Sequence, residues 1–482
     1  MLLEIVGAKA LAPFFGSSHF VWISQIVVTL ASLSFGSYFA YKIEKKLNND
    51  RRVAYSILYV AAAYIGFSTL FLNKIALSLI GFSLSTSALL ASILLYFIPL
   101  STVSCSYSLL VSTKIKESKD PIYGKLSAVG AIGSILGTIL FGYYLVKNFS
   151  NQSILVFSSF SLWLIAAINT LNHEKKTIKP IIYPIVFILT SGFLYTERTE
   201  TTEEFPKLLE VLNTSFGELK VVETKETIDV YNNNIIQGNY YKKTKQSAHL
   251  FSYALSSLAV NNTKNLESVF IMGLGLGLVP AELRRYGVEK IKSVEINEQF
   301  VDLAKKLKTL EESDSDIEIN DGRYSLMRSE EKFDCVIVDA FLVDNSPSHL
   351  NTKEFYQTIS AKLNKNGTVV INSFGFFSPE AMTTVAIFNT LKSVFKEVKS
   401  YSVENANVFF VASNSKLENS GKYDQRNIPE ELKPQLENLI LSERTNFEEK
   451  SSMILTDSFN PIDSLDVESR EKIRKLSLSV LN

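Results

Sequence analysis

The chain has 482 residues, a formal net charge of zero and a hydrophobic fraction of 46%. This length exceeds what one hydrophobic core usually supports, so we expect two or three domains. Zero net charge gives no argument for nucleic-acid binding. Two cysteines cannot build a disulfide framework, and four scattered histidines disfavour a zinc site. We therefore expect neither a metal nor a nucleic-acid partner.

Long apolar runs over residues 1–198 predict an α-helical membrane domain with several spans. A helix needs roughly 20 apolar residues to cross the hydrocarbon of a bilayer. The segment 2–15 is shorter and would form an incomplete first span. The full spans are predicted at 19–43, 52–73, 75–98 (alternatively on to 113), 122–147, 152–171 and 179–195.

The placement of lysine and arginine predicts which loops face the cytoplasm. Basic residues gather in three loops, near 42–52, 114–125 and 175–179. If 179–195 crosses fully, the remaining chain lies outside the cell, away from cytosolic substrates. The segment holds Pro180 and Pro184, so a re-entrant or interfacial path, or two spans within 75–113, would keep the remaining chain inside. We expect a bacterial-type inner-membrane protein with a cytoplasmic catalytic domain.

The predicted spans hold almost no ionisable residues, which transport pathways usually need. We therefore expect an anchor or an oligomerisation scaffold in the lipid bilayer rather than a transporter. Small residues recur at close spacing in SAVGAIGSILGTILFG, residues 127–142. Such spacing suits close helix–helix contact in lipid, including contact within a homo-oligomer.

Beyond residue 198 the composition becomes charged and mixed. Residues 199–246 alternate and turn like a small β-meander. Residues 247–415 alternate strand-like and helix-like segments, which predicts a Rossmann-like, doubly wound α/β domain with a mostly parallel sheet. Residues 416–482 are interpreted as a C-terminal extension, in which the polar stretch up to 450 indicates a loose connection or surface helices.

Glycines and carboxylates follow four successive predicted strands. In chain order these residues are Gly273, Gly275 and Gly277, then Glu295, then Asp321, then Asp339 and Asp344. Ligands on doubly wound sheets bind beyond the carboxyl ends of the strands. A lone carboxylate is usually a solvated charge, but acidic residues at successive strand ends favour a single ligand site.

The residue types indicate which ligand this site holds. Glycines let the backbone approach a ligand closely. Glu295 lies about twenty residues after the turn, where an acidic side chain accepts from both ribose hydroxyls. Asp321 is well placed for an adenine amino group, and Asp339 and Asp344 lie beside the expected reacting centre. The turn lacks the Gly-Lys-Ser/Thr ending of a phosphate loop, so an adenosyl ligand without phosphates fits better.

Several motifs together resemble one known family. They are GLGLG at 273–277, VEIN at 294–297, NDGR at 320–323, VIVDAF at 336–341 and HLNTKEFY at 349–356. The set resembles the spermidine synthase-like family of polyamine aminopropyltransferases, which has a class I S-adenosylmethionine-binding, methyltransferase-type fold. The apolar N-terminal half and ILTDSFNPID at 454–463 are similar to the membrane-fused members of that family.

The resemblance implies roles for individual residues. Glu295 would hold the ribose and Asp321 the adenine of S-adenosylmethionine or its decarboxylated form. Asp339 matches the family's catalytic carboxylate, with Asp344 as a second catalytic candidate, and Gln237 matches the glutamine of the β-domain motif. The implied reaction breaks the carbon–sulfonium bond and releases methylthioadenosine, without a metal or a prosthetic group. Asp339 would accept a proton from an attacking amine.

The sequence departs from the family pattern where the family binds its diamine. Neutral residues stand there in place of carboxylates, namely Leu276, His249, Leu250, Leu255 and Asn233. A dication such as putrescine needs carboxylates, because desolvating two ammonium groups beside leucines is costly. The leading hypothesis is therefore a lyase or cyclase, in which the substrate's own carboxylate attacks and yields a homoserine lactone.

Other functions remain open from the sequence. Aminopropyl transfer would need an amine held in another way, for example by Asp344, Asp457 or Asp463. Methyl transfer lacks a dedicated acceptor motif. A non-catalytic membrane sensor would bind the adenosyl ligand without turnover, and a transporter with a regulatory ligand domain is the least favoured.

Overall fold

The structure, a computed structural model, resolves two compact units. One comprises Met1–Glu203 with Asn213–Gly217, and the other comprises Glu204–Leu212 with Glu218–Asn482. The described residues are 2–16, 19–46, 51–118, 121–145, 148–173, 205–310, 316–341, 347–375, 377, 381–403, 407–417, 428–447, 452–465, 467, 470, 471 and 474. The predicted span 179–195 and the candidate Asp344 lie outside the described residues.

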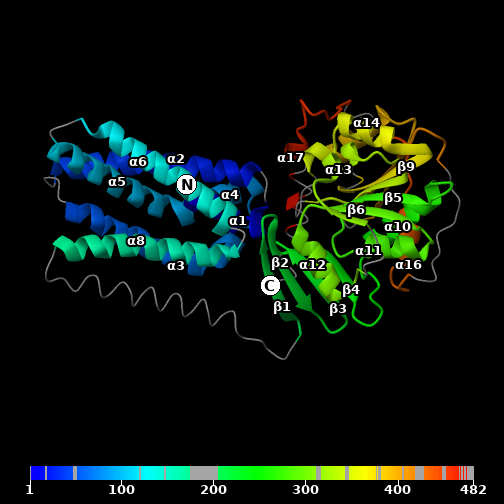
Figure 1. The fold of residues 1–482 in the computed structure, drawn as a ribbon, viewed down its shortest axis with the longest axis horizontal. Helices are drawn as coiled ribbons and strands as arrows, with labels where there is room; N and C mark the ends of the chain where they lie inside the picture. The colour runs from blue at the N-terminus through cyan, green and yellow to red at the C-terminus, as the bar shows by residue number, and fades with distance from the viewer. Residues whose placement is uncertain are drawn as a thin grey trace. The chain divides into compact units, whose positions relative to one another are not determined.

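The first unit is helical (Figure 1). Its elements are α1 (Leu2–Phe15), α2 (His19–Lys46), α3 (Arg51–Ser78), α4 (Leu84–Ser92), η1 (Ile93–Phe97), α5 (Ile98–Glu117), α6 (Tyr123–Ile139), η2 (Leu140–Leu145) and α8 (Asn151–His173). Within the described residues, five helices are long and apolar enough to cross a membrane. They are His19–Lys46, Arg51–Ser78, Leu84–Glu117, Tyr123–Gly142 and Asn151–Thr170.

One predicted span boundary is wrong. The prediction begins a span at residue 75, whereas α3 continues to Ser78 and the next helix begins at Leu84. Ser83 ends the intervening turn, because its side chain accepts a hydrogen bond from the backbone of Thr86 and caps α4. Hydropathy is high on both sides of this turn, so an apolar-run criterion does not detect the break.

Small residues allow two helices of the first unit to approach closely. A Cβ atom at Gly36 of α2 would lie 2.2 Å from the carbonyl oxygen of Ser101 in α5, so only glycine fits there. The Ser104 hydroxyl donates to the Leu33 carbonyl at 2.8 Å across the same contact. Helix α6 differs, since none of its residues is buried within the described part of the chain.

The second unit begins with a four-stranded sheet in the order β1-β2-β3-β4. Its strands are β1 (Lys207–Thr214), β2 (Gly217–Glu223), β3 (Thr227–Asn232) and β4 (Ile235–Tyr241). Strand β3 pairs antiparallel with both β2 and β4. Asn233 and Asn234 turn the chain between β3 and β4 with φ angles of 47° and 66°, a left-handed conformation that asparagine tolerates.

A seven-stranded sheet follows, in the order β10-β11-β9-β8-β5-β6-β7. Its strands are β5 (Ser268–Met272), β6 (Lys290–Glu295), β7 (Asp316–Ile319), β8 (Phe333–Val338), β9 (Leu363–Phe374), β10 (Glu397–Val403) and β11 (Asn407–Ser413). Strands β5 to β9 are parallel, and β10 and β11 form an antiparallel edge. The predicted Rossmann-like, mostly parallel sheet is confirmed.

Helices cover both faces of this sheet (Figure 1). They are α10 (Leu250–Asn262), α11 (Leu278–Arg285), α12 (Glu298–Leu307), α13 (Gly322–Arg328), α14 (Lys353–Lys362), α15 (Met382–Lys392) and α16 (Lys433–Leu441), with the short η3 (Ser348–Leu350) and α17 (Ile462–Leu465). Successive residues of a strand point to opposite faces, so Phe270 joins the core under α14 and α15 while Ile271 joins the core under α10 and α16. Both cores hold the carboxyl ends of the strands in fixed register.

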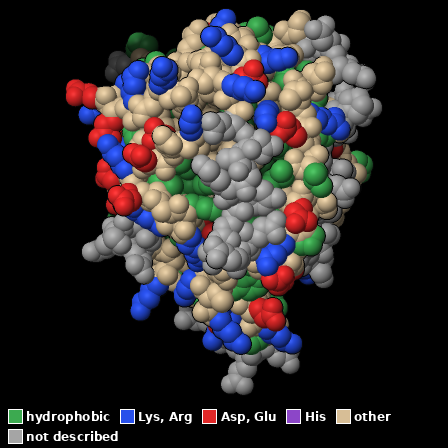
Figure 2. All heavy atoms as spheres, turned by 90° about the vertical axis from the view of Figure 1, so that its right-hand side faces the viewer, with side chains coloured by type: hydrophobic (Ala, Val, Ile, Leu, Met, Phe, Trp, Pro, Cys, Tyr) green, Lys and Arg blue, Asp and Glu red, His purple; other side chains and the backbone are tan. Residues whose placement is uncertain are grey.

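The C-terminal segments pack onto this domain. Leu436 and Leu439 of α16 are fully buried, so this part of the polar stretch is an integrated surface helix. On the face of the second unit shown in Figure 2, basic and acidic side chains are interspersed. Such mixing of charge is typical of a water-facing surface.

Candidate active site

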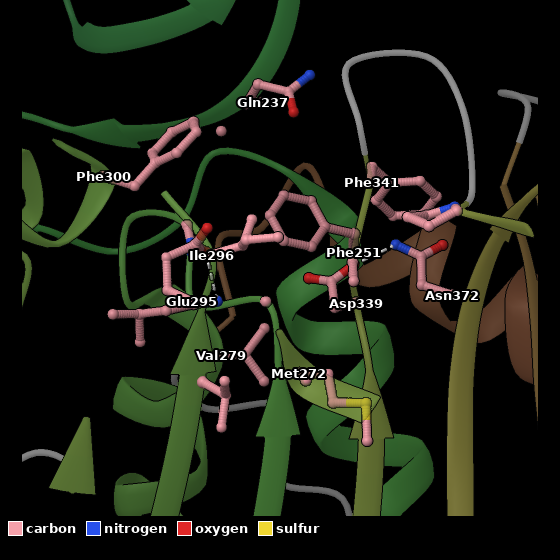
Figure 3. Close-up of a pocket in the computed structure, with 18 of the residues that line it drawn as sticks. Gln237, Phe251, Met272, Val279, Glu295, Ile296, Phe300, Asp339, Phe341 and Asn372 are labelled. Atoms are coloured by element: carbon pink, nitrogen blue, oxygen red, sulfur yellow. Dashed lines mark hydrogen bonds between the residues drawn. The ribbon is translucent and has the colours of Figure 1, made fainter. Parts of the chain in front are cut away.

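A cavity of about 350 Å³ lies at the carboxyl ends of β5, β6, β7, β8 and β9. Residues 235–238 of β4 and the start of α10 cover it from the other side. Gln237 lies across the cavity from Glu295 and Asp339 (Figure 3). Gly273, Gly275 and Asp321 also line it. The structure thus brings most of the sequence-predicted site residues to one cavity, with Gly277 capping α11 just behind it.

The glycine turn is needed for a close approach between two strand ends. A Cβ atom at Gly273, where φ is +90°, would lie 2.1 Å from the Asp339 carbonyl oxygen. Gly277 has a φ of 75° and precedes the first residue of α11. Any side chain at Gly273 would therefore push the turn away from the strand that carries Asp339.

The leucines of the turn pack in two apolar clusters. Leu274 packs with Val301, Ala304 and Leu310. Leu276 and Leu278 pack with the four-stranded sheet and α12, in a cluster whose members include Leu219, Val221, Val230, Tyr240 and Phe300. We call this second cluster the leucine seam. Leu276 is only 4% exposed, so its side chain joins the small sheet to the glycine turn.

Glu295 is bound to the backbone of the glycine turn. Its Oε2 accepts from the N–H groups of Leu274 at 2.9 Å and Gly275 at 3.1 Å, and its Oε1 accepts from Asn297 N–H at 2.9 Å. Burial raises the pKa of Glu295, and the backbone donors oppose that shift by stabilising the carboxylate. The carboxylate therefore fixes the turn at the edge of the cavity where the ribose is expected.

Glu295→Gln is expected to weaken adenosyl binding by about ten- to a hundredfold. The amide of glutamine would turn an NH₂ group toward at least one backbone N–H, leaving buried donors unpaired. Isothermal titration with S-adenosylmethionine measures the loss. Glu298→Gln is the matched control, because Glu298 is exposed three residues away. Equal affinity in both variants would contradict this role of Glu295.

Asp321, which follows β7, has two partners. Its Oδ1 accepts from the Tyr324 N–H at 2.9 Å and caps α13, and its Oδ2 lies 2.9 Å from His349 Nε2. The hydrogen bond from His349 is the main cause that lowers the pKa of Asp321. Ile296 lines the cavity nearby and is 41% exposed, which offers an apolar face for a base.

Asp457 has a partner other than an amine substrate. Arg323 donates to both of its carboxylate oxygens, at 2.8 and 2.6 Å. This bidentate pair lowers the pKa of Asp457 to about 2. Arg323 also donates to the carbonyl of His349 at 2.9 Å. The C-terminal motif therefore holds the loop beside the cavity, and Asp463 likewise lies 3.8 Å from Arg470.

Asp339 is the carboxylate at the end of β8 and is oriented by two asparagines. Asn372 Nδ2 donates to Asp339 Oδ1 at 2.8 Å, a bond drawn in Figure 3. Asn407 Nδ2 in turn donates to Asn372 Oδ1 at 2.8 Å, which fixes the Asn372 amide with its NH₂ toward Asp339. Burial raises the pKa of Asp339 to about 7, against the lowering effect of the Asn372 bond. Asp339 is thus poised to exchange a proton near neutral pH.

Three aromatic side chains surround this end of the cavity. Phe251, Phe341 and Phe374 line it, and the ring centroids of Phe341 and Phe374 are 4.4 Å apart. Phe251 and Phe341 lie next to Asp339 in Figure 3. Burial lowers the pKa of His249, which lines the same cavity.

Sequence reasoning missed several residues of the cavity. Phe251, Asn372 and Asn407 come from α10, β9 and β11, and no glycine or acidic signal marks them. Asn372 lies near the end of an apolar strand, where an amide side chain stands out in the sequence and could have indicated a site residue. Asn407 follows three residues outside the described part of the chain, and nothing in its local sequence indicates its contact with Asn372.

Residues 249–408 match the family model of the spermine/spermidine synthase domain. The match covers the glycine turn and the strand ends that form the cavity. This domain belongs to the spermidine synthase-like family. It has the class I S-adenosylmethionine-binding fold of that family, as the motifs of the sequence imply.

Curated relatives match part of this chain. The polyamine aminopropyltransferase of Saccharolobus solfataricus is 34% identical over 174 residues, covering 34% of this chain and 57% of the relative. The thermospermine synthase of Arabidopsis thaliana is 36% identical over 150 residues, covering 29% and 44%. The polyamine aminopropyltransferase of Bacillus mycoides is 26% identical over 214 residues, covering 43% and 76%. The matched region thus spans about half the length of the first two relatives.

Among solved structures, the spermidine synthase of Thermotoga maritima is similar to the spermidine synthase-like domain. The two chains are 18% identical, with a TM-score of 0.39 and coverage of 50% of this chain and 84% of the other. A probable spermidine synthase from Corynebacterium glutamicum has a TM-score of 0.42 at 13% identity, covering 53% of this chain and 98% of that one.

Proposed function

We propose that the spermidine synthase-like domain transfers the aminopropyl group of decarboxylated S-adenosylmethionine to an amine. The observation that carries the proposal is Asp339, a carboxylate whose pKa is raised to about 7 and whose orientation is set by Asn372 at the cavity wall. The matched relatives are aminopropyltransferases and a thermospermine synthase, which supports transfer to an amine over the lyase reaction that the sequence favoured.

The reaction is a displacement at the carbon attached to the sulfonium. Glu295 and Asp321 bind the ribose and the adenine, which fixes the sulfonium toward Asp339. Asp339 accepts a proton from the acceptor ammonium, and the freed nitrogen lone pair forms the new N–C bond. The C–S bond breaks, its electron pair stays on sulfur, and neutral methylthioadenosine leaves. Positioning and a cavity with little water supply the rate enhancement.

A lyase remains the second candidate, because one observation favours it. Among the described residues that line the cavity beyond β8, Asp339 is the sole carboxylate, so a diamine finds no second counter-charge among these residues. In the lyase reaction the carboxylate of S-adenosylmethionine attacks its own γ-carbon. The same C–S bond breaks, and the products are methylthioadenosine and homoserine lactone.

The activity is expected to rise with pH through about pH 7. The raised pKa of Asp339 means that its carboxyl is protonated below this pH and cannot accept a proton, whereas the carboxylate form prevails above it. The pH profile of kcat/KM measures this. Two acceptors with different amine pKa values distinguish the ionisation of Asp339 from that of the acceptor. The part of the pH profile that is due to Asp339 must be the same with both acceptors. A limb near pH 4, the ordinary range of a carboxyl, would contradict the assignment.

Product identification by mass spectrometry tests the proposed function. The full chain, purified in detergent, is incubated with S-adenosylmethionine alone, with the decarboxylated form alone, and with the decarboxylated form plus a primary amine. An aminopropylated amine and methylthioadenosine in the third mixture support the transferase. Methylthioadenosine from the first mixture supports the lyase instead. A methylated product, or binding without any product, would overturn both.

We also propose that the five long apolar helices anchor the chain in a lipid bilayer, with the enzyme domain on the cytoplasmic side. Their length and composition support the anchor, and the cytosolic origin of the adenosyl substrate supports the orientation. Carbonate extraction tests the anchor, and protease protection of the C-terminal domain in inverted and right-side-out vesicles tests the side.

A further inference from the structure

We propose that the acceptor is a primary monoamine carried on an apolar body, not a diamine or a polyamine. The inference rests on the proposed aminopropyl transfer and names the class of its second substrate. It follows from how charged and apolar groups divide between the two sides of the cavity.

The sheet order separates an adenosyl side from an acceptor side. The glycine turn follows the central strand β5, and β6 and β7 lie on one side of it with Glu295 and Asp321 at their ends. Strands β8, β9 and β11 lie on the other side and carry Asp339, Asn372 and Asn407. An acceptor that approaches the sulfonium from beyond Asp339 therefore contacts Asp339, Asn372 and Asn407.

The acceptor side offers one negative charge among its described lining residues. Asp339 is that carboxylate, and Asn372 and Asn407 are neutral amides. His249 also lines the cavity, and burial lowers its pKa against the opposing charge of Asp229. One carboxylate neutralises one ammonium group, which is the group that reacts.

The remaining surface of the acceptor side is apolar and aromatic. Phe251, Phe341 and Phe374 line it. An aromatic face attracts a cation before it is deprotonated, and it packs well against hydrocarbon afterwards. This wall suits the alkyl or aromatic body of a monoamine.

Binding a diamine in this cavity is unfavourable. Its second ammonium would lose its water beside phenylalanine without gaining a carboxylate from the lining residues that the structure describes. Removing an ammonium group from water without a partner is costly. An apolar group in the same place gains free energy instead, because its own hydrocarbon surface leaves water.

The acceptor preference of the full chain, purified in detergent, tests the inference. Release of methylthioadenosine from saturating decarboxylated S-adenosylmethionine is measured with n-hexylamine, 2-phenylethylamine, putrescine and spermidine. We expect kcat/KM for the two monoamines to exceed that for putrescine by at least about tenfold. A preference for putrescine or spermidine would overturn the inference and leave the proposed transfer intact. Release with none of the amines would overturn the proposed transfer itself.

One substitution should reverse the preference. Phe251→Asp places a second carboxylate beside Asp339, so kcat/KM for putrescine should rise relative to n-hexylamine by at least about tenfold. Phe251→Leu is the matched control, since it keeps the wall apolar and should keep the monoamine preference. If the ratio of kcat/KM for putrescine to that for n-hexylamine is the same in both variants and in the unaltered protein, the aromatic surface at Phe251 does not select the acceptor.

Discussion

Asp339→Asn is expected to reduce the rate of methylthioadenosine release by about 10²–10⁴-fold while leaving adenosyl binding largely intact. The asparagine side chain fills nearly the same space, and its oxygen can still accept from Asn372, so the cavity keeps its shape. It cannot accept the proton of the acceptor ammonium, so the nitrogen keeps no lone pair for attack. A stopped assay of methylthioadenosine and a binding titration measure the two quantities separately.

Asp302→Asn is the control for this substitution, because Asp302 is exposed on α12 and lies outside the cavity. It should retain full activity. A rate in the Asp339 variant within a factor of about three of the unaltered protein would remove this carboxylate from the proposed mechanism, since general-base catalysis typically contributes far more. Loss of adenosyl binding together with activity would instead indicate a structural role.

Leu276→Asp is expected to destabilise the second unit strongly. The carboxylate would lie in the leucine seam, an apolar cluster that includes Tyr240 and Phe300. Truncating a buried leucine to alanine costs about 2–5 kcal/mol, and burying an unpaired charge adds to that loss. Thermal unfolding of Leu276→Asp and Leu276→Ala, with Leu276→Met as a volume-matched control, ranks the loss of stability in the three variants.

This prediction separates two explanations of the leucine turn. If Leu276→Asp melts like the unaltered protein and gains activity with putrescine, the position is a substrate-binding site that lost its charge. If it unfolds at lower temperature without such activity, the leucine is a packing residue of the seam. The burial of Leu276 and its contact with the small sheet support the second explanation.

The sequence was informative where a single residue type carries the chemistry. Glycine at a close backbone approach and carboxylates at successive strand ends marked Gly273, Glu295 and Asp339 without any knowledge of the fold. The parallel sheet followed from alternating strands and helices. These features are local, so one segment of chain contains the whole signal.

The acceptor side could not be predicted because it is assembled from distant segments. Phe251 lies in the first turn of α10, Phe341 follows β8 and Asn407 begins β11, and each is an ordinary residue in its own segment. The interpretation of Leu276 from the sequence was also incomplete, because its contacts are with distant segments of the chain. From the sequence it marked a missing amine ligand, whereas its partners in β2 to β4 and α12 lie between 24 and 57 residues away in the chain.

The dependence of methylthioadenosine release on an added monoamine is the most direct test of the proposed transfer. With decarboxylated S-adenosylmethionine and the full chain, we expect negligible release without amine and saturable release as n-hexylamine increases, with one aminopropylated amine formed per methylthioadenosine. Release from S-adenosylmethionine that no amine accelerates would contradict the proposed transfer and assign the domain to the lyases.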